Sequence, residues 1–352
     1  MNRKSIIRNN LLDIPFISII IKYDYYLEGN IDISLYPEGI VEILRVLKDG
    51  RIVIAMSNKF EMNAIKIINP ITNKESIIRS LVGTLTKMVI LPDNRIIISG
   101  YEDVIGIINP DTEEYDLIFK EHQRQIEEIA LLRDSKILSR DSNTILIWDS
   151  FTGKVENKLE VDPSSDFFTE LPNNKILIGD QDLKIIDLKT HEIKILEKYI
   201  NEGLLYEGNL LIIFRDGSSM KLDLNTQKII PFINDLDFRH SRVIGIHGNY
   251  IITVGYGVVY FWNLETGLCD FEYRSNESII QGLTLPDGRI ALIIDYQILI
   301  FNVNDSPKGF LDPELIIDNH YRNIQIALLP DGRLVTTTHD ENNETGELII
   351  WK

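Results

Sequence analysis

Residues Thr144–Gly153, with the sequence TILIWDSFTG, predict a strand followed by a tight turn. Residues 145–148 form a continuous apolar run of β-branched and aromatic side chains, as expected of a largely buried strand. Asp149 can accept hydrogen bonds from the backbone two residues on, and Gly153 tolerates the positive φ that ends such a turn. Because weaker copies of this stretch recur along the chain, we interpret it as one unit of a repeat.

Two markers recur in a fixed order along the sequence. The first is a hairpin turn between apolar runs, in which Pro presets the first turn position and Gly or Asn takes the left-handed one. Its eight copies are at residues 48–51, 92–95, 133–136, 172–175, 207–209, 247–249, 286–289 and 330–333. The second is an Asn/Asp-x-x-Thr turn, which begins at Asn69, Asn109, Asp149, Asp187, Asp223, Asn263 and, in a degenerate form, Asn302.

The spacing of the second marker predicts the fold class. Successive turns begin 40, 40, 38, 36, 40 and 39 residues apart. A period near 40 with four short strands in each unit is the signature of a β-propeller. A β-sandwich with coincidental turns, or a β-solenoid that does not close, would not require this alternation of two markers.

The repeat resembles the WD-repeat (WD40) family over about residues 30 to 352. Trp148-Asp149 is the one intact Trp-Asp pair, while Trp262-Asn263 and Trp351-Lys352 keep only the Trp. The family's Asp, six positions before the Trp, is matched by Asp180, Asp216 and Asp295; in the best repeat that position is Ser142, with Asp141 displaced by one. The nearest survivors of the family's Gly-His pair are His122, His240 and His320. The resemblance therefore implies that the Asp-His-Ser-Trp hydrogen-bond network of these proteins is mostly absent and that apolar packing stabilises the repeats.

We expect an all-β protein, an eight-bladed WD40-like propeller over residues 29–352, with seven blades as the alternative. The last repeat lacks its fourth strand, and a spare strand with alternating apolar residues precedes the first repeat at about residues 30–35. Supplying the missing outer strand from this segment would pair the two chain ends and leave no open edge.

Residues 1–28 lie outside the repeat and predict a short N-terminal helix. Asp13 is suited to an N-cap and Pro15 to the first turn. The helix is apolar on all faces, so it must pack on the propeller or dock on a second protein. Its candidate docking residues are Ile14, Phe16, Ile17, Ile20, Ile21 and Tyr23.

The stretch Leu12–Tyr23 resembles the first helix of an F-box, although Asp13 and Pro15 replace that motif's usual Pro and Glu. The order of elements and the Ile/Asn-rich composition also resemble WD-repeat proteins of giant amoebal viruses. These resemblances imply a viral substrate adaptor that binds a Skp1-like adaptor of a host ubiquitin ligase.

Composition restricts the function classes. The formal net charge of −17 would repel nucleic acid at long range. The single cysteine, Cys269, excludes an internal disulfide framework and fits a reducing compartment. No apolar run approaches the ~20 residues of a membrane helix, and the N-terminus lacks a signal-peptide cleavage site. We therefore expect a cytoplasmic protein, in the host cytoplasm if viral, that binds neither nucleic acid nor membrane.

No catalytic or cofactor signature stands out. The six histidines lack metal-ligand spacing, and neither a glycine-rich phosphate loop nor a Gly-x-Ser-x-Gly elbow occurs. We expect no metal, no cofactor and no enzymatic activity.

Protein binding is the function that we predict from the loops. In WD-repeat propellers, the loops between the two middle strands and from each outer strand to the next inner strand commonly form the recognition face. Tyr and Arg carry much interface energy. The candidates of these types in the loops are Tyr101, Arg140, Arg239, Tyr256, Tyr296 and Tyr321. We predict a non-enzymatic interaction scaffold, with a structural or virion-associated protein and a propeller hydrolase as the alternatives.

Overall fold

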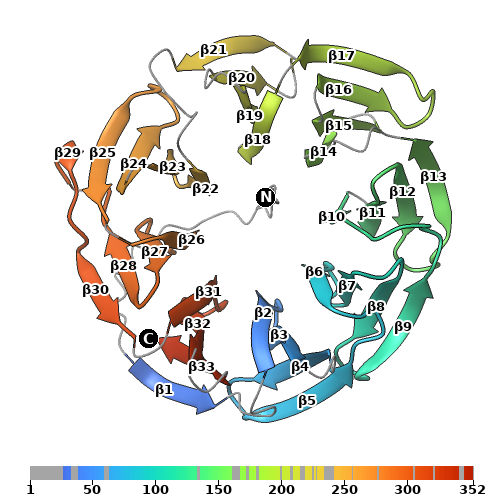
Figure 1. Ribbon diagram of the computed structural model, residues 1–352, viewed down its shortest axis with the longest axis horizontal. Helices are drawn as coiled ribbons and strands as arrows, with labels where there is room; N and C mark the ends of the chain where they lie inside the picture. The colour runs from blue at the N-terminus through green and yellow to red at the C-terminus, as the bar shows by residue number, and fades with distance from the viewer. Residues whose placement is uncertain are drawn as a thin grey trace. The chain divides into compact units, whose positions relative to one another are not determined.

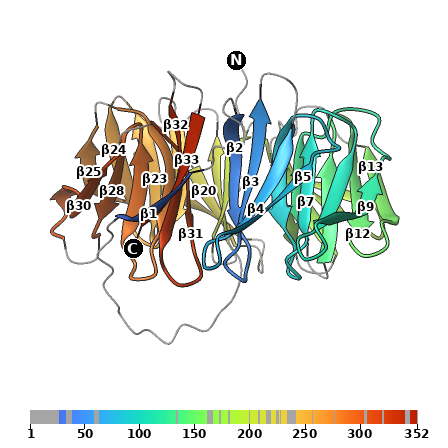
Figure 2. The ribbon, with the colours of Figure 1, turned by 90° about the horizontal axis from the view of Figure 1, so that it is seen from below.

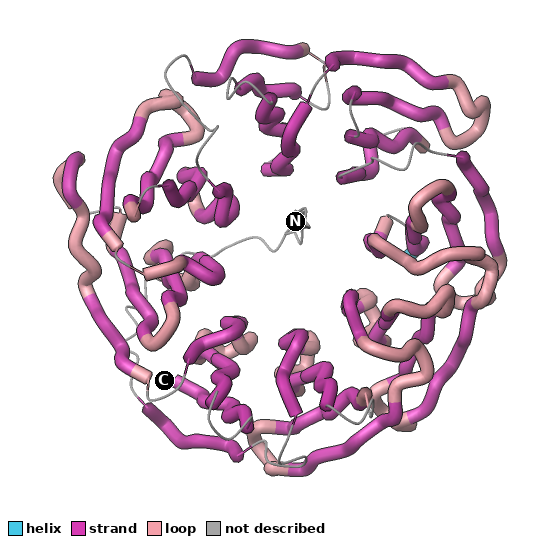
Figure 3. Tube along the Cα trace, viewed as in Figure 1, coloured by secondary structure: helices cyan, strands magenta, loops and turns pink. Residues whose placement is uncertain are grey.

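The computed structural model describes residues 27–32, 39–58, 63–132, 135–160, 167–171, 174–179, 182–198, 200–206, 209–214, 219–223, 226, 228–233, 242–255, 257–275, 277–303, 306–319, 322–340 and 345–351. These residues form strands, turns and loops, without an α-helix among them (Figure 3). The helix predicted within residues 1–28 falls outside the described part of the chain.

The described residues belong to two compact units. The first unit comprises those within 22–161, 292–299 and 316–352. Its sheets have the orders β1-β33-β32-β31, β2-β3-β4-β5, β6-β7-β8-β9 and β10-β11-β12-β13 (Figure 1). The strands are β1 (Leu27–Asp32), β2 (Gly39–Val46), β3 (Ile52–Asn58), β4 (Ala64–Asn69), β5 (Lys74–Arg79), β6 (Leu85–Ile90), β7 (Ile96–Gly100), β8 (Ile105–Asn109), β9 (Glu114–Phe119), β10 (Glu128–Leu131), β11 (Lys136–Arg140), β12 (Thr144–Asp149), β13 (Val155–Glu160), β31 (Arg322–Leu328), β32 (Leu334–Asp340) and β33 (Thr345–Trp351).

The second unit comprises the described residues within 162–291 and 300–315. Its sheets have the orders β14-β15-β16-β17, β18-β19-β20-β21 and β22-β23-β24-β25-β29, and a further sheet has the order β26-β27-β28-β30. The strands are β14 (Phe167–Leu171), β15 (Lys175–Gly179), β16 (Asp182–Asp187), β17 (Ile193–Lys198), β18 (Ile200–Tyr206), β19 (Asn209–Phe214), β20 (Ser219–Asp223), β21 (Ile229–Ile233), β22 (Arg242–His247), β23 (Tyr250–Gly255), β24 (Val258–Asn263), β25 (Cys269–Arg274), β26 (Ile279–Thr284), β27 (Ile290–Ile294), β28 (Gln297–Phe301), β29 (Gly309–Phe310) and β30 (Leu315–Asp318).

The two sequence markers adopt the backbone conformations that their residue types allow. In the hairpins, Gly50 and Asn94 have positive φ angles of 87° and 72°. In the Asn/Asp turns, Asp149 Oδ1 accepts hydrogen bonds from the backbone N–H groups of Phe151 (3.0 Å) and Thr152 (2.7 Å). The local turn chemistry therefore has the geometry expected from the sequence.

In the sheets β6–β9 and β10–β13, the two middle strands are buried on both faces, whereas the fourth strand is not. All five residues of β7 are buried, and so are residues 145–148 of β12. The fourth strand β13 instead alternates between partly buried and exposed positions up to Leu159. This difference explains why the middle strands have continuous apolar sequences and the fourth strands have mixed ones.

The first strand of the described chain pairs with its last. β1 lies antiparallel to β33, with Ile31 opposite Leu348 (Figure 1). The strand expected at about residues 30–35 overlaps β1. Through this pairing β1 takes the fourth place in the sheet of β31–β33, and the edge of β33 is covered.

Side chains of the first strands connect neighbouring sheets within the first unit. Leu44 N–H on β2 donates to Gln325 Oε1 on β31 (2.7 Å), and Arg45 Nε donates to the Met88 carbonyl on β6 (3.3 Å). Lys87 Nζ on β6 forms an ion pair with Glu128 Oε2 on β10 (2.6 Å). The first strands are thus linked to one another, and the fourth strands lie at the opposite edge of each sheet.

Two arginines connect the hairpin of one sheet to the Asn/Asp turn of the next. Arg51, in the β2–β3 hairpin, donates to the Pro110 carbonyl (2.8 Å) and to Asp111 Oδ1 (2.7 Å) in the β8–β9 turn. Arg95, in the β6–β7 hairpin, donates to the Ser150 carbonyl (2.8 Å) in the β12–β13 turn. The two sequence markers are therefore physical partners across neighbouring repeats.

Trp148 occupies the centre of the apolar contact between the sheets β6–β9 and β10–β13. Its side chain is 1% exposed, and its ring centroid lies 5.0 Å from that of Phe119 on β9. Gly153 follows in the turn with a φ of +72°, and a Cβ atom there would lie 2.4 Å from Phe119 Cε1. The glycine is required by both its backbone angle and the close approach of this ring.

We predict that Trp148→Ala lowers the free energy of unfolding by about 3–5 kcal/mol, because it leaves a large cavity between two sheets. Denaturant titration of the purified protein measures this change. Phe151→Ala is the control, since Phe151 is 61% exposed; its effect should stay below about 1 kcal/mol. Equal losses for the two variants would contradict the assignment of Trp148 to the core.

Candidate interaction face

Each sheet built from four consecutive strands has two ends with different connections. The first-to-second hairpin and the third-to-fourth turn lie at one end, which we call the turn end. The second-to-third loop and the connection to the next sheet lie at the other, the loop end; Figure 2 shows strands of the first unit running between these ends. For the sheet β10–β13, the loop end consists of residues 120–127 and 141–143.

A buried chain of hydrogen bonds anchors both of these loops to the sheet. Trp148 Nε1–H donates to Ser139 Oγ (2.6 Å), which lies 2.6 Å from His122 Nε2. His122 Nδ1 in turn lies 2.9 Å from Asp141 Oδ2. Neutral His122 with its proton on Nδ1 satisfies every member, because Ser139 can then donate to Nε2 while Nδ1–H donates to Asp141. The loop residues His122 and Asp141 are thereby tied to the core residue Trp148.

This hydrogen-bond network refines one expectation from the sequence. From the sequence we expected the Asp-His-Ser-Trp network to be mostly absent, because Asp141 is displaced from the family position and the Gly-His pair around His122 is lost. In the sheet β10–β13 it is complete, because the β11–β12 loop brings Asp141 to the imidazole. Elsewhere among the described residues, only its Trp end is observed: Trp262 Nε1–H donates to Thr253 Oγ1 (3.0 Å) and Trp351 Nε1–H to Thr336 Oγ1 (2.9 Å).

Burial and hydrogen bonding determine the protonation states of His122 and Asp141 in this hydrogen-bond network. Burial lowers the pKa of His122 below its ordinary value, and the hydrogen bond and charge of Asp141 only partly offset this effect. For Asp141, burial alone would raise the pKa. Hydrogen bonds from Asn143 N–H, His122 and Thr144 N–H outweigh it, so that the pKa of Asp141 is lowered. At neutral pH the network therefore contains the neutral imidazole of His122 beside the carboxylate of Asp141.

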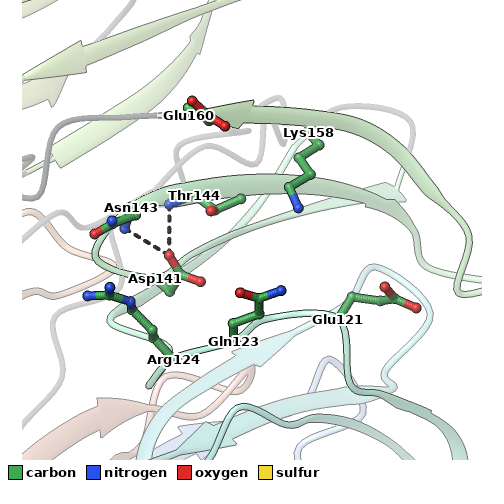
Figure 4. Close-up of a pocket in the computed structure, with 8 residues that line it drawn as sticks. All are labelled: Glu121, Gln123, Arg124, Asp141, Asn143, Thr144, Lys158 and Glu160. Atoms are coloured by element: carbon green, nitrogen blue, oxygen red, sulfur yellow. Dashed lines mark hydrogen bonds between the residues drawn. The ribbon is translucent and has the colours of Figure 1, made fainter.

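A polar pocket of about 390 Å³ lies at this loop end (Figure 4). Its lining residues are Glu121, Gln123, Arg124, Asp141, Asn143, Thr144, Lys158 and Glu160. Asp141 Oδ1 accepts hydrogen bonds from Asn143 N–H (2.8 Å) and Thr144 N–H (2.7 Å), which forms one wall. Arg124 donates to Ser142 Oγ (3.2 Å) beside it.

The charged rim of the pocket is available to a ligand. Glu121, Lys158 and Glu160 are exposed, and the described residues provide no ion-pair partner for any of the three. Figure 4 shows Lys158 and Glu160 on β13 above the pocket and Glu121 and Gln123 below it. A surface with both signs of charge, held on an anchored floor, is suited to polar recognition of a second molecule.

The residues predicted from the sequence are distributed over separate loops. Tyr101 in the β7–β8 loop is 62% exposed, and Tyr296 in the β27–β28 loop is 46% exposed. Arg140 ends β11 and is only 7% exposed, with its guanidinium 2.9 Å from Glu127 Oε2. The exposure that an interaction surface requires is thus present at the two tyrosines and absent at Arg140.

The remaining predicted residues are not described by the structure, and the pocket residues are ones that the sequence did not single out as interface residues. Arg239, Tyr256, Tyr321 and the helix residues Ile14, Phe16, Ile17, Ile20, Ile21 and Tyr23 lie outside the described residues. The pocket residues were not among the predicted interface residues. The choice of Tyr and Arg by interface frequency passes over Glu, Gln and Lys, and Arg124 was not among the loop residues selected. The position of residues 120–127 between two predicted strands was the one available signal.

A second polar pocket, of about 420 Å³, lies at the turn end around Arg51. Arg51 already binds Asp49, Pro110 and Asp111 there, so its donors hold two sheets together. Among the described residues, no group of three or more His, Cys, Asp or Glu side chains could hold a metal ion. The same residues include no helix long and apolar enough to cross a membrane.

Comparison with known proteins identifies the fold. No protein-family model matches the chain. Apoptotic protease-activating factor 1 of Rattus norvegicus is 39% identical over 66 residues, which cover 18% of this chain and only 5% of that protein. Among solved structures, the C-terminal WD40 domain of Sif2 has a TM-score of 0.67 at 13% identity and covers 93% of this chain and 97% of its own.

Two further structures agree. The Dos1 propeller has a TM-score of 0.68 at 10% identity, covering 94% of this chain and 95% of its own. The computationally designed Ika8 protein has a TM-score of 0.65 at 14% identity, covering 89% of this chain and 96% of its own. The chain therefore has the all-β propeller fold of WD40 domains, as the repeat predicted.

We predict that the stability of the protein falls as the pH decreases below about 6.5, the ordinary pKa of histidine. The unfolded chain then binds a proton that folded His122 does not, so protonation favours unfolding. Denaturant titrations between about pH 7 and pH 5 measure the slope. His122→Gln should show a smaller slope than the unmodified protein, whereas parallel curves would contradict a neutral His122.

Proposed function

We propose that this protein is a non-enzymatic interaction scaffold that binds other proteins at the loop end of its sheets. The observation that carries this proposal is the pocket at the loop end of β10–β13, whose floor is anchored through His122 and Asp141 to buried Trp148. Similarity in fold to WD40 domains supports this role by analogy alone, because a fold by itself specifies no function.

The geometry of the pocket supports a protein partner. Its wall residue Asp141 is fixed by three hydrogen bonds, so little side-chain entropy is lost there on binding. Exposed Lys158, Glu121 and Glu160 supply both signs of charge for orientation, and Tyr101 offers an exposed aromatic on the preceding sheet. The formal net charge of −17 favours a protein with basic segments over nucleic acid or an anionic membrane surface.

The propeller in this proposal has eight blades, one for each of the eight sheets, and β1 completes the last of them by pairing with β33. The protein acts in the cytoplasm, in agreement with its single cysteine.

We predict that Lys158→Glu weakens the binding of the principal partner at least tenfold, because it reverses the charge at the pocket. Affinity purification of the full chain from cells, quantified by mass spectrometry, identifies partners that this variant loses. Lys74→Glu is the matched control, since Lys74 is a 77% exposed lysine at the turn end. Equal partner sets for the unmodified protein and Lys158→Glu, with unchanged melting temperatures, would contradict the proposed face.

In its more specific form, the proposal is a viral substrate adaptor whose residues 13–26 bind a Skp1-like component of a host ubiquitin ligase. It rests on the resemblance of Leu12–Tyr23 to an F-box helix. We predict that the full chain captures a Skp1-like or cullin protein and that replacement of Ile17 and Ile20 by Glu abolishes this capture. If the unmodified chain captures neither protein, a structural or virion-associated role replaces the adaptor.

A further inference from the structure

The protein covers one sheet edge with a segment from elsewhere in its own chain. Residues 307–311, which we call the strap, follow β28 and place β29 parallel to β25 at the edge of its sheet (Figure 1). Phe271 pairs with Gly309 and Glu272 with Phe310, and Leu311 N–H donates to the Glu272 carbonyl (2.8 Å). The fourth strand of a sheet in this fold can therefore accept a fifth strand.

Side chains fix the register of the strap through one ion pair and one aromatic contact. Lys308 Nζ lies 2.6 Å from Asp270 Oδ1, and Asp270 is only 3% exposed. The guanidinium of Arg274 lies 5.4 Å from the centroid of the Phe310 ring. Gly309, between these two, has a φ of +127°, which favours glycine. The edge of β25 thus recognises a basic residue, a glycine and an aromatic residue in that order.

Asp270 has a distinctive place in its strand. Phe261 pairs with Phe271 and Trp262 with Cys269, so Asp270 is the extra residue of a β-bulge. Bulges reorient the side chain of the extra residue, here toward the edge where the strap lies.

The strand β9 has the same bulge with the same residue type. Ile107 pairs with Leu117 and Ile108 with Tyr115, so Asp116 is its extra residue. In this register Lys120 corresponds to Arg274, and Ile118, which is 54% exposed, corresponds to Glu272. Asp116 is exposed and has no ion-pair partner among the described residues. No strand of the described chain pairs with β9 beyond β8.

The fourth strands β5, β13, β17 and β21 lack this combination. In β13 the bulge residue is Glu156, which already lies 2.7 Å from Lys136 Nζ, and the acid Glu160 stands in the place of Arg274. β5 pairs with β4 without a bulge. In β17 and β21 the extra residues are the apolar Leu196 and Phe232. Of these strands, β9 alone combines the strap-binding residue types with an open edge.

We propose that the edge of β9 is a second protein-binding site, which accepts an extended partner segment with the pattern basic–Gly–aromatic as a fifth, parallel strand. Backbone hydrogen bonds to the open edge supply affinity, as in other complexes formed by strand addition. The basic residue pairs with Asp116, and the aromatic ring contacts Lys120 through its face. This proposal rests on the proposed scaffold function but uses a surface separate from the loop-end pocket.

A labelled peptide that contains the strap and one residue on each side, SPKGFLD (residues 306–312), tests the site by fluorescence anisotropy with the full chain. We expect saturable binding that Asp116→Asn weakens at least tenfold and Asp116→Lys abolishes. A peptide in which Glu replaces Lys308 can form the ion pair with Asp116→Lys, with the charges reversed. Binding of this peptide by Asp116→Lys would support the register. Glu156→Gln, at the equivalent position on β13, is the matched control and should leave binding unchanged.

Three outcomes would overturn the proposal: no binding to the unmodified protein, equal binding to Asp116→Asn, or loss of binding in Glu156→Gln. Equal binding to Asp116→Asn would indicate displacement of the strap from β25 instead. Lys158→Glu separates this site from the loop-end face, because it should remove cellular partners without changing peptide binding. If Lys158→Glu loses cellular partners but the unmodified protein binds no peptide, the β9 site alone is refuted and the loop-end face is retained.

Discussion

The contact between Arg51 and the β8–β9 turn is the interaction on which the stacking of the sheets depends. Its guanidinium reaches from one hairpin to the Pro110 carbonyl and the Asp111 carboxylate of the next repeat, and Arg95 repeats the same reach to Ser150. A guanidinium presents several donors in a fixed plane, so it can hold its own turn and a neighbouring one at the same time. Together with the hydrogen bond from Arg45 to the Met88 carbonyl, the contact adds directional links to the non-directional apolar packing between these two sheets.

These links matter because no sheet has a core of its own. In the sheets β6–β9 and β10–β13 the middle strands are buried on both faces, and the apolar clusters combine residues of two sheets, as in the packing of Trp148 against Phe119. Each repeat therefore gains most of its burial from its neighbours. The pairing of β1 with β33 serves the same requirement, since it completes a sheet whose fourth strand comes from the other end of the described chain.

The same packing determines where recognition can occur. The turn end is occupied by the arginine contacts. At the loop end, hydrogen bonds from Trp148 through Ser139 and His122 to Asp141 anchor two loops to the core. Glu121, Lys158 and Glu160 at the rim of the resulting pocket have no ion-pair partner within the described residues. The edges of the sheets form a third kind of surface, and the strap on β25 shows what such an edge recognises.

The sequence by itself determined the repeat, the strand order within each repeat and both kinds of turn, because these depend on local signals. The signals are Gly or Asn at positive φ, the hydrogen bonds of Asp149 within its own turn, and continuous apolar runs. Only the tertiary structure decided which turns bind each other, that Arg140 is buried, and that displaced Asp141 still reaches His122. These facts depend on loop paths and on the distance between sheets, to which no local pattern is sensitive. The bulge that makes Asp116 equivalent to Asp270 belongs to the same class, since it exists only in the pairing of two strands.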